Sequence, residues 1–444
     1  MALPALLKSS GATLVTTVVI TAVGFITSVI TARVLGPEGR GLLSGALMIA
    51  TLAANISLFG LANAFIYHKG TGRPFRYLLF MVLSLIFVAT FSLVTGYIGL
   101  QVTHEQQLHD ELWLILGMSS ISAMQGYFYA LSQLDPALRF FNLMRFLLVV
   151  GNLILLLILL VVFPVVDFRQ ILITQMIVSA GLTLAGIIWA RNNRVWQGAD
   201  DAKPNVSWNS MLAYGASHHG TVALGLLLVN FDKIALLNIG TIVEYGFYAL
   251  AFTTSRLIGA VQEAVSTALY SKFAGKDIET LSHHVRVSFR LTFIPMLLLA
   301  ALGAALSPWL IVWVYGASFA ATVIPFAVLL FECVISGASW TLAQRFNAGG
   351  QPGLVFIRQC ISVLPVFAAL PFLPEHNIHV WLSLLMLLGA ILRLVVTLGI
   401  YPYVLKESMP AIFPTKSDCR KVLDMLVKRN PDLQLKGTAM PVEK

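Results

Sequence analysis

The chain has 444 residues, 58% of them hydrophobic and only 11% charged, with a formal net charge of +9. This composition excludes an ordinary soluble domain and predicts a protein that resides in a lipid bilayer. The three cysteines, Cys333, Cys360 and Cys419, lie far apart in the sequence, so they indicate neither a disulfide framework nor a metal site.

Apolar runs long enough to cross a bilayer recur along the whole chain, because a transmembrane helix needs roughly 20 mainly apolar residues. About twelve such runs predict an all-α polytopic membrane protein. The stretch 306–322 contains SPWLIVWVYGASFAAT, whose proline, glycine and aromatic residues predict a loop at the membrane interface. The first run lacks a small-x-small cleavage site, so a cleaved signal peptide is not predicted. The runs cover residues 11–33, 41–67, 77–100, 112–132, 141–163, 171–190, 211–239, 245–270, 288–306, 321–344, 354–373 and 380–405.

The basic residues are concentrated at the two ends and in every second connection between these runs. These regions carry 22 Lys and Arg residues, whereas the other connections carry only 3, namely Arg33, Arg40 and Arg169. Because cytoplasmic loops are enriched in Lys and Arg, both termini are predicted to be cytoplasmic. The positive net charge is therefore a topology signal and a source of contact with anionic lipids, and it does not indicate nucleic-acid binding.

A polar segment, ARNNRVWQGADDAKPNVSWNS at 190–210, follows the sixth run and divides the chain into two halves. LGPEGRGLLSGALMIA (35–50) resembles IGTIVEYGFYALAFTT (239–254), which indicates an internal repeat. The alternative is that the similarity reflects only the Leu and Gly content common to membrane helices. Transporters built from repeats bind substrate between the repeats, so a central cavity between two lobes is predicted. The predicted parts are an N-terminal six-helix lobe (1–195), a cytoplasmic linker (196–207), a C-terminal six-helix lobe (208–405) and a basic cytoplasmic tail (406–444).

Six ionisable residues fall deep inside the predicted membrane spans, where a lone charge costs several kcal/mol, and Arg145, Arg33 and Arg345 lie nearer the helix ends. Such side chains must face water or an oppositely charged partner, so they are candidates for the substrate site and for ion coupling. The six deep residues are Asp232, Lys233, Arg256, Glu263, Glu332 and Arg393.

The seventh run contains a seam of polar residues. His218 and Asp232 lie 14 positions apart, which places them within about 40° of one helix face. His219 and Lys233 form a parallel stripe. The seam predicts the wall of a water-filled cavity, with His218 and Lys233 contacting substrate and Asp232 coupling to an ion. The alternatives are an Asp–Lys pair that locks this helix to a neighbour and a buried histidine with hydrogen-bond partners.

Arg256 and Glu263 lie seven positions apart on the eighth run, two turns along one helix face. A guanidinium stays charged and can bind two oxygens of an anionic group at once, so Arg256 is the leading candidate for binding an anionic substrate. Glu263 is predicted to pair with Arg256 in the empty state or to carry a coupling proton. Glu332 is a further coupling candidate, and Arg393 is predicted to line the same cavity as Arg256. A purely structural Arg–Glu pair is the alternative.

The first two runs carry uncharged hydrogen-bonding groups. Threonine, serine and glycine recur every three or four residues along the first run, where they either contact sugars or allow close helix packing. Arg33, at the outer end of that run, and Asn55, on the second run, are predicted substrate contacts.

Several enzyme signatures are missing from the sequence. A GxxxxGK[ST] phosphate loop is not found, so ATP hydrolysis is not predicted. Neither a His/Cys/Asp cluster with metal spacing nor a paired acid and base at one membrane face is found. The sequence therefore predicts a protein that is not an enzyme, with no catalytic residues, no metal and no cofactor. The segment 417–429 is predicted to form a basic amphipathic helix on the inner leaflet.

Three stretches resemble one known family of membrane proteins. ITARVLGPEGRGLLSGAL, LAYGASHHG with VNFDKIALLNIGTIVEYGFYALAF, and SPWLIVWVYGASFAAT are similar to the polysaccharide transporter family, the Wzx-type flippases of the multidrug/oligosaccharidyl-lipid/polysaccharide exporter superfamily. The resemblance covers most of the chain. It implies a two-lobed, twelve-helix fold in the bacterial inner membrane. The histidines of SHHG depart from the family pattern, and they leave the coupling details open.

The resemblance also implies a function, which is to move undecaprenyl-pyrophosphate-linked sugar units from the cytoplasmic to the periplasmic leaflet by alternating access. Its implied partners are the lipid-linked oligosaccharide, membrane lipids and the proteins that polymerise and export surface polysaccharide such as O-antigen or exopolysaccharide. The alternative function is cation-coupled efflux of small organic cations, as in the drug-exporter branch of the superfamily. Drug exporters need an acidic cavity, whereas Lys233, Arg256 and Arg393 favour an anionic substrate.

The asymmetry of the basic residues makes a prediction about topology. In a chain whose native cysteines are replaced, Glu105→Cys is expected to react with an impermeant maleimide added to intact cells, whereas Asp200→Cys is not. Labelling of the cysteine at position 200 but not at position 105 would reverse the orientation.

Overall fold

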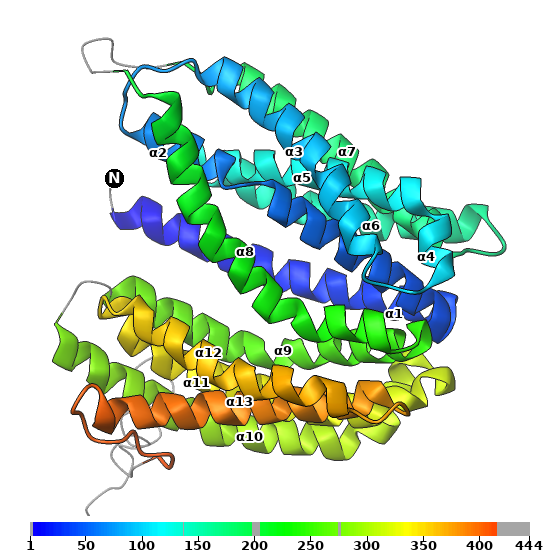
Figure 1. The fold of residues 1–444 in the computed structure, drawn as a ribbon, viewed down its shortest axis with the longest axis vertical. Helices are drawn as coiled ribbons and strands as arrows, with labels where there is room; N and C mark the ends of the chain where they lie inside the picture. Colours follow the sequence, from blue (N-terminus) through cyan, green and yellow to red (C-terminus); the bar gives the residue numbers. More distant parts are fainter. Residues whose placement is uncertain (1–2, 136, 198–204, 274–276, 415–444) are drawn as a thin grey trace, which may run out of the picture. The chain divides into compact units, whose positions relative to one another are not determined.

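A computed structural model describes residues 3–135, 137–197, 205–273 and 277–414. These residues form helices joined by short connections (Figure 1). The helices are α1 (Leu3–Ser57), α2 (Leu61–Gly70), α3 (Tyr77–Leu100), α4 (Gln106–Asp110), α5 (Leu112–Leu131), α6 (Arg139–Val162), α7 (Phe168–Asn192), α8 (Trp208–Ile239), α9 (Ile242–Phe273), α10 (Ile278–Tyr315), α11 (Val323–Ala348), α12 (Pro352–Ala369) and α13 (Ile378–Tyr403), with short 3-10 turns at Ser132–Leu134, Ala317–Thr322 and Leu370–Phe372.

The predicted fold class, an all-α protein that spans the membrane many times, is confirmed. The first predicted run corresponds to the part of α1 before Gly36, the second run covers the rest of α1 and most of α2, and each later run corresponds to one helix. Within the described part of the chain, eight helical segments are long and apolar enough to cross a membrane. A helix can cross because it pairs its own backbone N–H and C=O groups, for which hydrocarbon offers no partners.

The predicted interfacial loop at 306–322 is wrong. Helix α10 continues through Pro308 to Tyr315, and a 3-10 turn, Ala317–Thr322, follows directly. A proline inside a membrane helix is tolerated where neighbouring groups satisfy the freed carbonyl, so Pro308 does not end the helix. The break comes at Gly316, whose φ of 104° lies in a region that favours glycine.

Helix α1 bends sharply at Gly36, which has φ 66° and ψ −177° and is followed by Pro37. This backbone conformation is open to glycine and costly for other residues. Arg40 reaches back across the bend. Its Nη1 donates to Thr31 Oγ1 at 3.0 Å and its Nη2 to Ser28 Oγ at 3.2 Å. The bend therefore divides α1 into two helices that meet at Gly36, and a side chain of the second helix holds the bend.

The segment after the bend packs backbone to backbone against the start of α9. A Cβ atom at Gly41 would lie 2.0 Å from the carbonyl oxygen of Ile242, and one at Gly246 would lie 2.2 Å from the carbonyl oxygen of Pro37. Both positions therefore require glycine. The contact joins the two stretches whose sequences resemble each other, 35–50 and 239–254.

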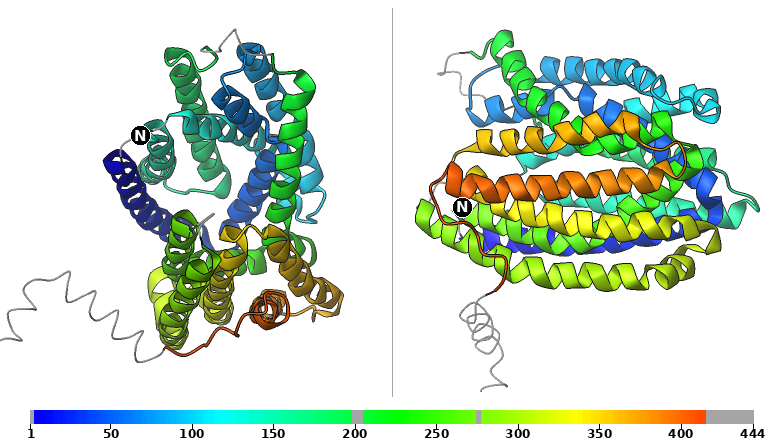
Figure 2. Two further views of the ribbon diagram at one scale, coloured as in Figure 1. Left: turned by 90° about the vertical axis from the view of Figure 1, so that its left-hand side faces the viewer. Right: turned by 60° about the horizontal axis from the view of Figure 1, so that its bottom comes forward.

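The chain forms two compact units. Unit 1 comprises residues 1–250, 310–322 and 374–379, and unit 2 comprises the rest. In unit 1, α1 packs against α3, α5, α6 and α7, and α8 packs against α2. In unit 2, α10 to α13 run along one another (Figures 1 and 2). Helix α8 and the start of α9 belong to unit 1, so the boundaries of the two units differ from those of the predicted lobes. The lobes at 1–195 and 208–405, with a linker at 196–207, therefore stay a prediction. Residues 406–414 of the tail are described, and the predicted helix at 417–429 lies outside the described residues.

The helices differ in how many of their large apolar side chains are buried. Tyr127 and Phe128 of α5 are fully buried in unit 1, and a Cβ at Gly186 of α7 would lie 2.6 Å from Phe128. Helix α6, in contrast, exposes Ile158 and Val161. An apolar surface of this kind is compatible with a lipid environment, whereas water would penalise it.

The bend in α1 generates a stability prediction. Replacing Gly36 by alanine forces a Cβ into a backbone region reserved for glycine, so the free energy of unfolding is expected to fall by about 1–3 kcal/mol. Nothing lies within 4 Å of a Cβ at Gly36, so the effect is one of backbone strain alone. Thermal unfolding of the purified protein in detergent measures it.

Gly24 on the same helix provides the control. It also has nothing within 4 Å of an added Cβ, but its φ is not positive. Gly24→Ala is therefore expected to be neutral or slightly stabilising. Equal destabilisation by the two substitutions would show that the bend stores no strain.

Candidate functional site

A cavity of about 490 Å³ lies inside unit 1, between α1, α5, α6 and α7. Its floor and walls combine aliphatic side chains with amides and hydroxyls. Arg145 is the one lining residue with a formal charge, and the described lining contains no carboxylate. The polar lining residues are Thr51, Asn55, Ser122, Gln125, Tyr129, Arg145, Asn152, Gln175 and Ser179.

The hydrogen-bonding groups of this cavity are only partly used by the protein itself. Asn55 donates through Nδ2 to the Thr51 carbonyl at 2.8 Å. Asn152 Oδ1 is buried and has no hydrogen-bond partner. Arg145 donates to Thr17 Oγ1 at 3.3 Å and lies 5.8 Å from the centre of the Phe141 ring. The cavity therefore offers amide oxygens, hydroxyls and one fixed cation, groups that suit a hydroxyl-rich or anionic ligand.

A second polar group lies within the helices of unit 2. Arg256 Nη2 contacts Glu332 Oε2 at 2.6 Å, and its guanidinium lies 4.2 Å from the centre of the Phe252 ring. Ser336 donates to the other oxygen of Glu332 at 2.8 Å. Arg393 interacts electrostatically with both members of this pair. The structure thus brings together three of the predicted site residues, Arg256, Glu332 and Arg393.

The predicted pairing of Arg256 with Glu263 is wrong. Seven positions do place both residues on one side of α9, but Glu263 is exposed and no ion pair joins it to Arg256. The neighbouring helix α11 supplies the carboxylate instead. Helix periodicity cannot foresee a partner from another helix, and this tertiary contact decides the pairing.

Arg358 is a buried cation that the sequence placed at the cytoplasmic end of a span. It lies within α12, is 1% exposed, and has no carboxylate partner among the described residues. Its Nη1 donates to Ser339 Oγ at 2.6 Å and to Thr397 Oγ1 at 3.1 Å, while its Nε has no partner. Arg256, Arg358 and Arg393 therefore share a region in which Glu332 is the buried carboxylate.

The polar seam of α8 is closed around Asp232, which is completely buried. Tyr248 donates to Asp232 Oδ2 at 2.6 Å, and Lys233 Nζ lies 3.3 Å from Oδ1. Both carboxylate oxygens thus have partners, and the bond from Tyr248 ties α8 to α9, as expected if Asp232 holds this helix to a neighbour. His219 is buried beside Phe59, with ring centres 5.0 Å apart. The side chain of His218 lies outside the described part of the structure.

Arg33 contacts backbone carbonyls at the end of α10. It donates to the Val314 carbonyl at 2.7 Å and to the Trp313 carbonyl at 2.5 Å. The carbonyls at a helix C-terminus carry partial negative charge and have no partners inside the helix, so Arg33 caps this helix end.

Two carboxylates with several partners were not singled out from the sequence. Glu244 forms a capping box with Thr241, and its Oε1 accepts from the Ile378 amide at 2.9 Å and contacts His379 Nδ1 at 3.1 Å. The spacing Thr-x-x-Glu ahead of an apolar run, TIVE at 241–244, is the signal that could have identified it.

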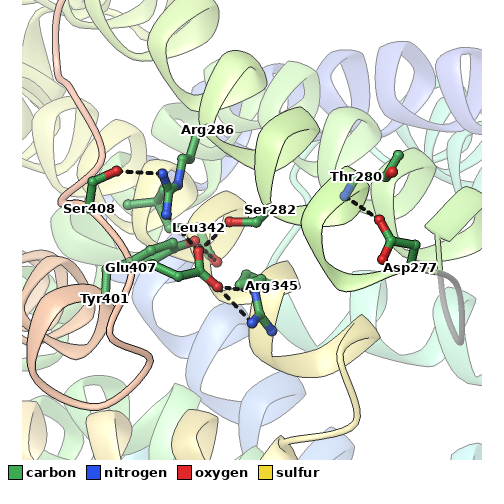
Figure 3. Close-up of polar contacts among 9 residues, drawn as sticks. All are labelled: Asp277, Thr280, Ser282, Arg286, Leu342, Arg345, Tyr401, Glu407 and Ser408. Carbon is green, nitrogen blue, oxygen red and sulfur yellow. Dashed lines mark hydrogen bonds and ion pairs between the residues drawn. The ribbon is translucent and has the colours of Figure 1, made fainter.

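The other carboxylate is Glu407, which follows α13 and joins α10 and α11 (Figure 3). Arg345 donates to Oε1 through Nε at 3.0 Å and Nη2 at 2.7 Å, and Arg286 donates to Oε2 at 2.6 Å. Ser282 donates to the same Oε2. Burial acts to raise the pKa of Glu407, but the hydrogen bonds from Ser282 and Arg345 and the two positive charges outweigh burial and lower that pKa.

A search of the described residues for three or more His, Cys, Asp or Glu side chains that could hold a metal ion finds no such group.

Comparison with solved structures identifies the fold. The chain superposes on the lipid II flippase MurJ in an inward closed conformation with a TM-score of 0.67, over 97% of this chain and 93% of that chain, at 13% identity. An inward-facing multidrug-resistance MATE family transporter of the MOP superfamily gives 0.60, over 85% and 92%, at 14% identity. A mutant of the Vibrio cholerae MATE transporter VcmN gives 0.55, over 89% and 95%, at 12% identity.

The chain therefore has the fold shared by MurJ and the MATE transporters, as a membrane protein with many spans. No family model matches the sequence, and no curated protein sequence matches it either.

The contacts of Glu407 generate a prediction about pH. Because its pKa is lowered in the folded protein, the carboxylate stabilises the fold at neutral pH, and this contribution is lost as pH falls below the usual glutamate range. Glu407→Gln leaves Arg345, whose side chain is 6% exposed, without its anion. The expected loss is about 1–3 kcal/mol at pH 7.

Thermal unfolding of the variant and the wild type across pH 3.5–8 is the measurement, with the difference shrinking below about pH 4.3. Glu279→Gln on α10, an exposed glutamate, is the control and should follow the wild type. A Glu407→Gln deficit of the same size at every pH would contradict the assignment.

Proposed function

We propose that this protein is a flippase that moves an undecaprenyl-pyrophosphate-linked oligosaccharide from the cytoplasmic to the periplasmic leaflet by alternating access, for surface polysaccharide synthesis. The observation that carries the proposal is the character of the cavity in unit 1, which is rich in amides and hydroxyls and has one cation and no carboxylate in its described lining. The likeness to a structure named as a lipid II flippase supports it at the level of the fold.

Charge separates this proposal from efflux of organic cations, the second candidate. A cationic drug that leaves water needs a carboxylate or an aromatic cage to replace its hydration. The cavity presents Arg145 instead, and in unit 2 Arg256 pairs with Glu332 while Arg393 and the buried Arg358 lie in the same region. An anionic substrate gains from these groups and a cationic one is repelled, so the lipid-linked diphosphate is the better match.

The sugar portion of the substrate calls for uncharged donors and acceptors. Asn55, Gln125, Asn152 and Gln175 line one cavity together with four hydroxyl side chains. Buried amides without partners are costly, so the free Asn152 Oδ1 favours a ligand or water that donates to it. We assign Asn55 and its neighbours to the oligosaccharide.

Arg256 is assigned to the diphosphate. Its side chain is 32% exposed, so it stays accessible while Glu332 neutralises it in the empty state. A diphosphate would displace Glu332, and the released carboxylate could then take up a proton or Na⁺. Arg393 and Lys233 would add positive charge, and His218 and Arg33 remain proposed contacts. Glu332 is the preferred coupling residue, with Glu263 and Asp232 as alternatives.

The test is binding of undecaprenyl pyrophosphate to the purified protein, combined with accumulation of lipid-linked units in the inner leaflet of cells. Arg256→Ala removes charge-assisted hydrogen bonds of about 1.5–3 kcal/mol, so affinity should fall roughly ten- to a hundred-fold. Arg256→Lys should restore it only in part, because an ammonium cannot make the two parallel contacts. Glu332→Gln, which removes the competing carboxylate, should bind at least as tightly as the wild type but turn over slowly.

Arg76→Ala, an exposed arginine outside the cavity, is the matched control and should bind normally. Unchanged binding and normal surface polysaccharide in the Arg256→Ala strain, at equal protein levels, would remove Arg256 from the mechanism. Efflux of a cationic dye without binding of the pyrophosphate would favour the drug-exporter function.

A further inference from the structure

A second hollow in unit 1, which we call the basic pocket, lies between the end of α2, the start of α6 and the end of α7. It has a volume of about 450 Å³ and is separate from the cavity that contains Arg145. Lys69, Arg139 and Arg194 line it together with Asp135 and Trp189. Arg191 lines an adjoining hollow that shares Arg194 and Gln197 with the basic pocket.

The charges of the basic pocket are not balanced by the protein. Asp135 accepts the backbone N–H groups of Ala137 and Arg139 at 3.0 Å each, so both of its oxygens are used at the start of α6. Lys69 donates to the Gln197 carbonyl. The exposed guanidiniums of Arg139 and Arg194 make no hydrogen bond or ion pair with the described residues. The guanidinium donors of Arg139 and Arg194 are therefore available to an anion in the pocket.

Arg194 occupies a backbone position that favours glycine. Its φ is 45°, its N–H donates to the Arg191 carbonyl at 3.1 Å, and the Val195 N–H donates to the Ala190 carbonyl at 3.1 Å. These bonds form the C-terminal motif in which glycine usually follows the helix. The positive φ makes the backbone of Arg194 strained, and strained residues of this kind cluster at functional sites.

The surroundings of the pocket match the border between headgroups and acyl chains. Trp189 stacks on Phe140 with ring centres 4.9 Å apart and planes 4° apart. Within the five residues of α7 that precede Trp189, Leu184, Ile187 and Ile188 are exposed. Tryptophan favours the headgroup level of a membrane, and exposed aliphatic side chains favour its acyl chains. A soluble anion would gain nothing from this apolar flank.

We infer that the basic pocket binds the phosphodiester headgroup of an anionic phospholipid, with Arg139, Arg194 and Lys69 at the phosphate and the acyl chains along the exposed face of α7. Clusters of basic residues at the cytoplasmic ends of membrane helices attract such lipids. The inference does not rest on the proposed function, because these residues are separate from Arg256 and from the cavity lined by Arg145.

The experiment uses the purified, delipidated full-length protein and measures binding of phosphatidylglycerol by native mass spectrometry and by its effect on thermal unfolding. The wild type should bind phosphatidylglycerol, and phosphatidylethanolamine should bind at least ten-fold more weakly. Arg194→Gly should weaken phosphatidylglycerol binding about ten-fold and, because it relieves the strained backbone, raise the melting temperature without lipid. A variant that merely misfolds would lower that temperature.

Arg139→Gln combined with Arg194→Gly should abolish the preference for the anionic lipid, whereas Arg76→Gln and Arg256→Ala should retain it. Retention of wild-type affinity by the double variant would overturn the inference. Stabilisation by free glycerol phosphate as strong as that by the lipid would assign the pocket to a soluble phosphate. Displacement of phosphatidylglycerol by undecaprenyl pyrophosphate at equal concentration would assign it to a transported substrate, and either result overturns a resident phospholipid.

Discussion

The cost of placing a charge or an unpaired polar group in hydrocarbon governs this structure. It requires the backbone to be helical wherever the chain crosses the membrane, and it requires each buried ionisable side chain to find a partner. Asp232 is enclosed by Tyr248 and Lys233, and Arg256 by Glu332 and Phe252. Arg358 is the extreme case, because hydroxyls and a carbonyl replace the missing anion.

The same constraint explains why the buried cations of unit 2 are candidates for binding rather than for stability. A buried ion pair contributes little net stability, because desolvation offsets most of the attraction between the charges. The Arg256–Glu332 pair with two further arginines, Arg393 and Arg358, in the same region is harder to explain as structure alone, since hydrophobic residues would pack there at lower cost. Binding of an anionic ligand would balance the excess of positive charge in this region.

Glycine at a few positions allows the helices of unit 1 to meet as closely as they do. Gly36 turns α1, and Gly41 and Gly246 let two backbones touch with no side chain between them. Close approach of this kind is how membrane helices gain packing energy, because the hydrophobic effect gives no net drive between helices already surrounded by lipid. The bend at Gly36, the Arg40 hydrogen bonds across it and the backbone contact at Gly41 and Gly246 all lie in the two stretches of similar sequence, 35–50 and 239–254.

The sequence by itself determined the helices, because apolar runs of membrane length have few other structures open to them. It also indicated a break between residues 33 and 41 and charges at Arg256, Glu332 and Arg393 inside the spans. Only the tertiary structure decided which charges meet. Helix periodicity relates residues on one helix, such as Arg256 and Glu263, whereas Glu332 comes from α11 and Glu407 from the segment after α13. The continuation of α10 past Pro308 and the cavity around Arg145 depend likewise on neighbouring helices, whose packing no single segment encodes.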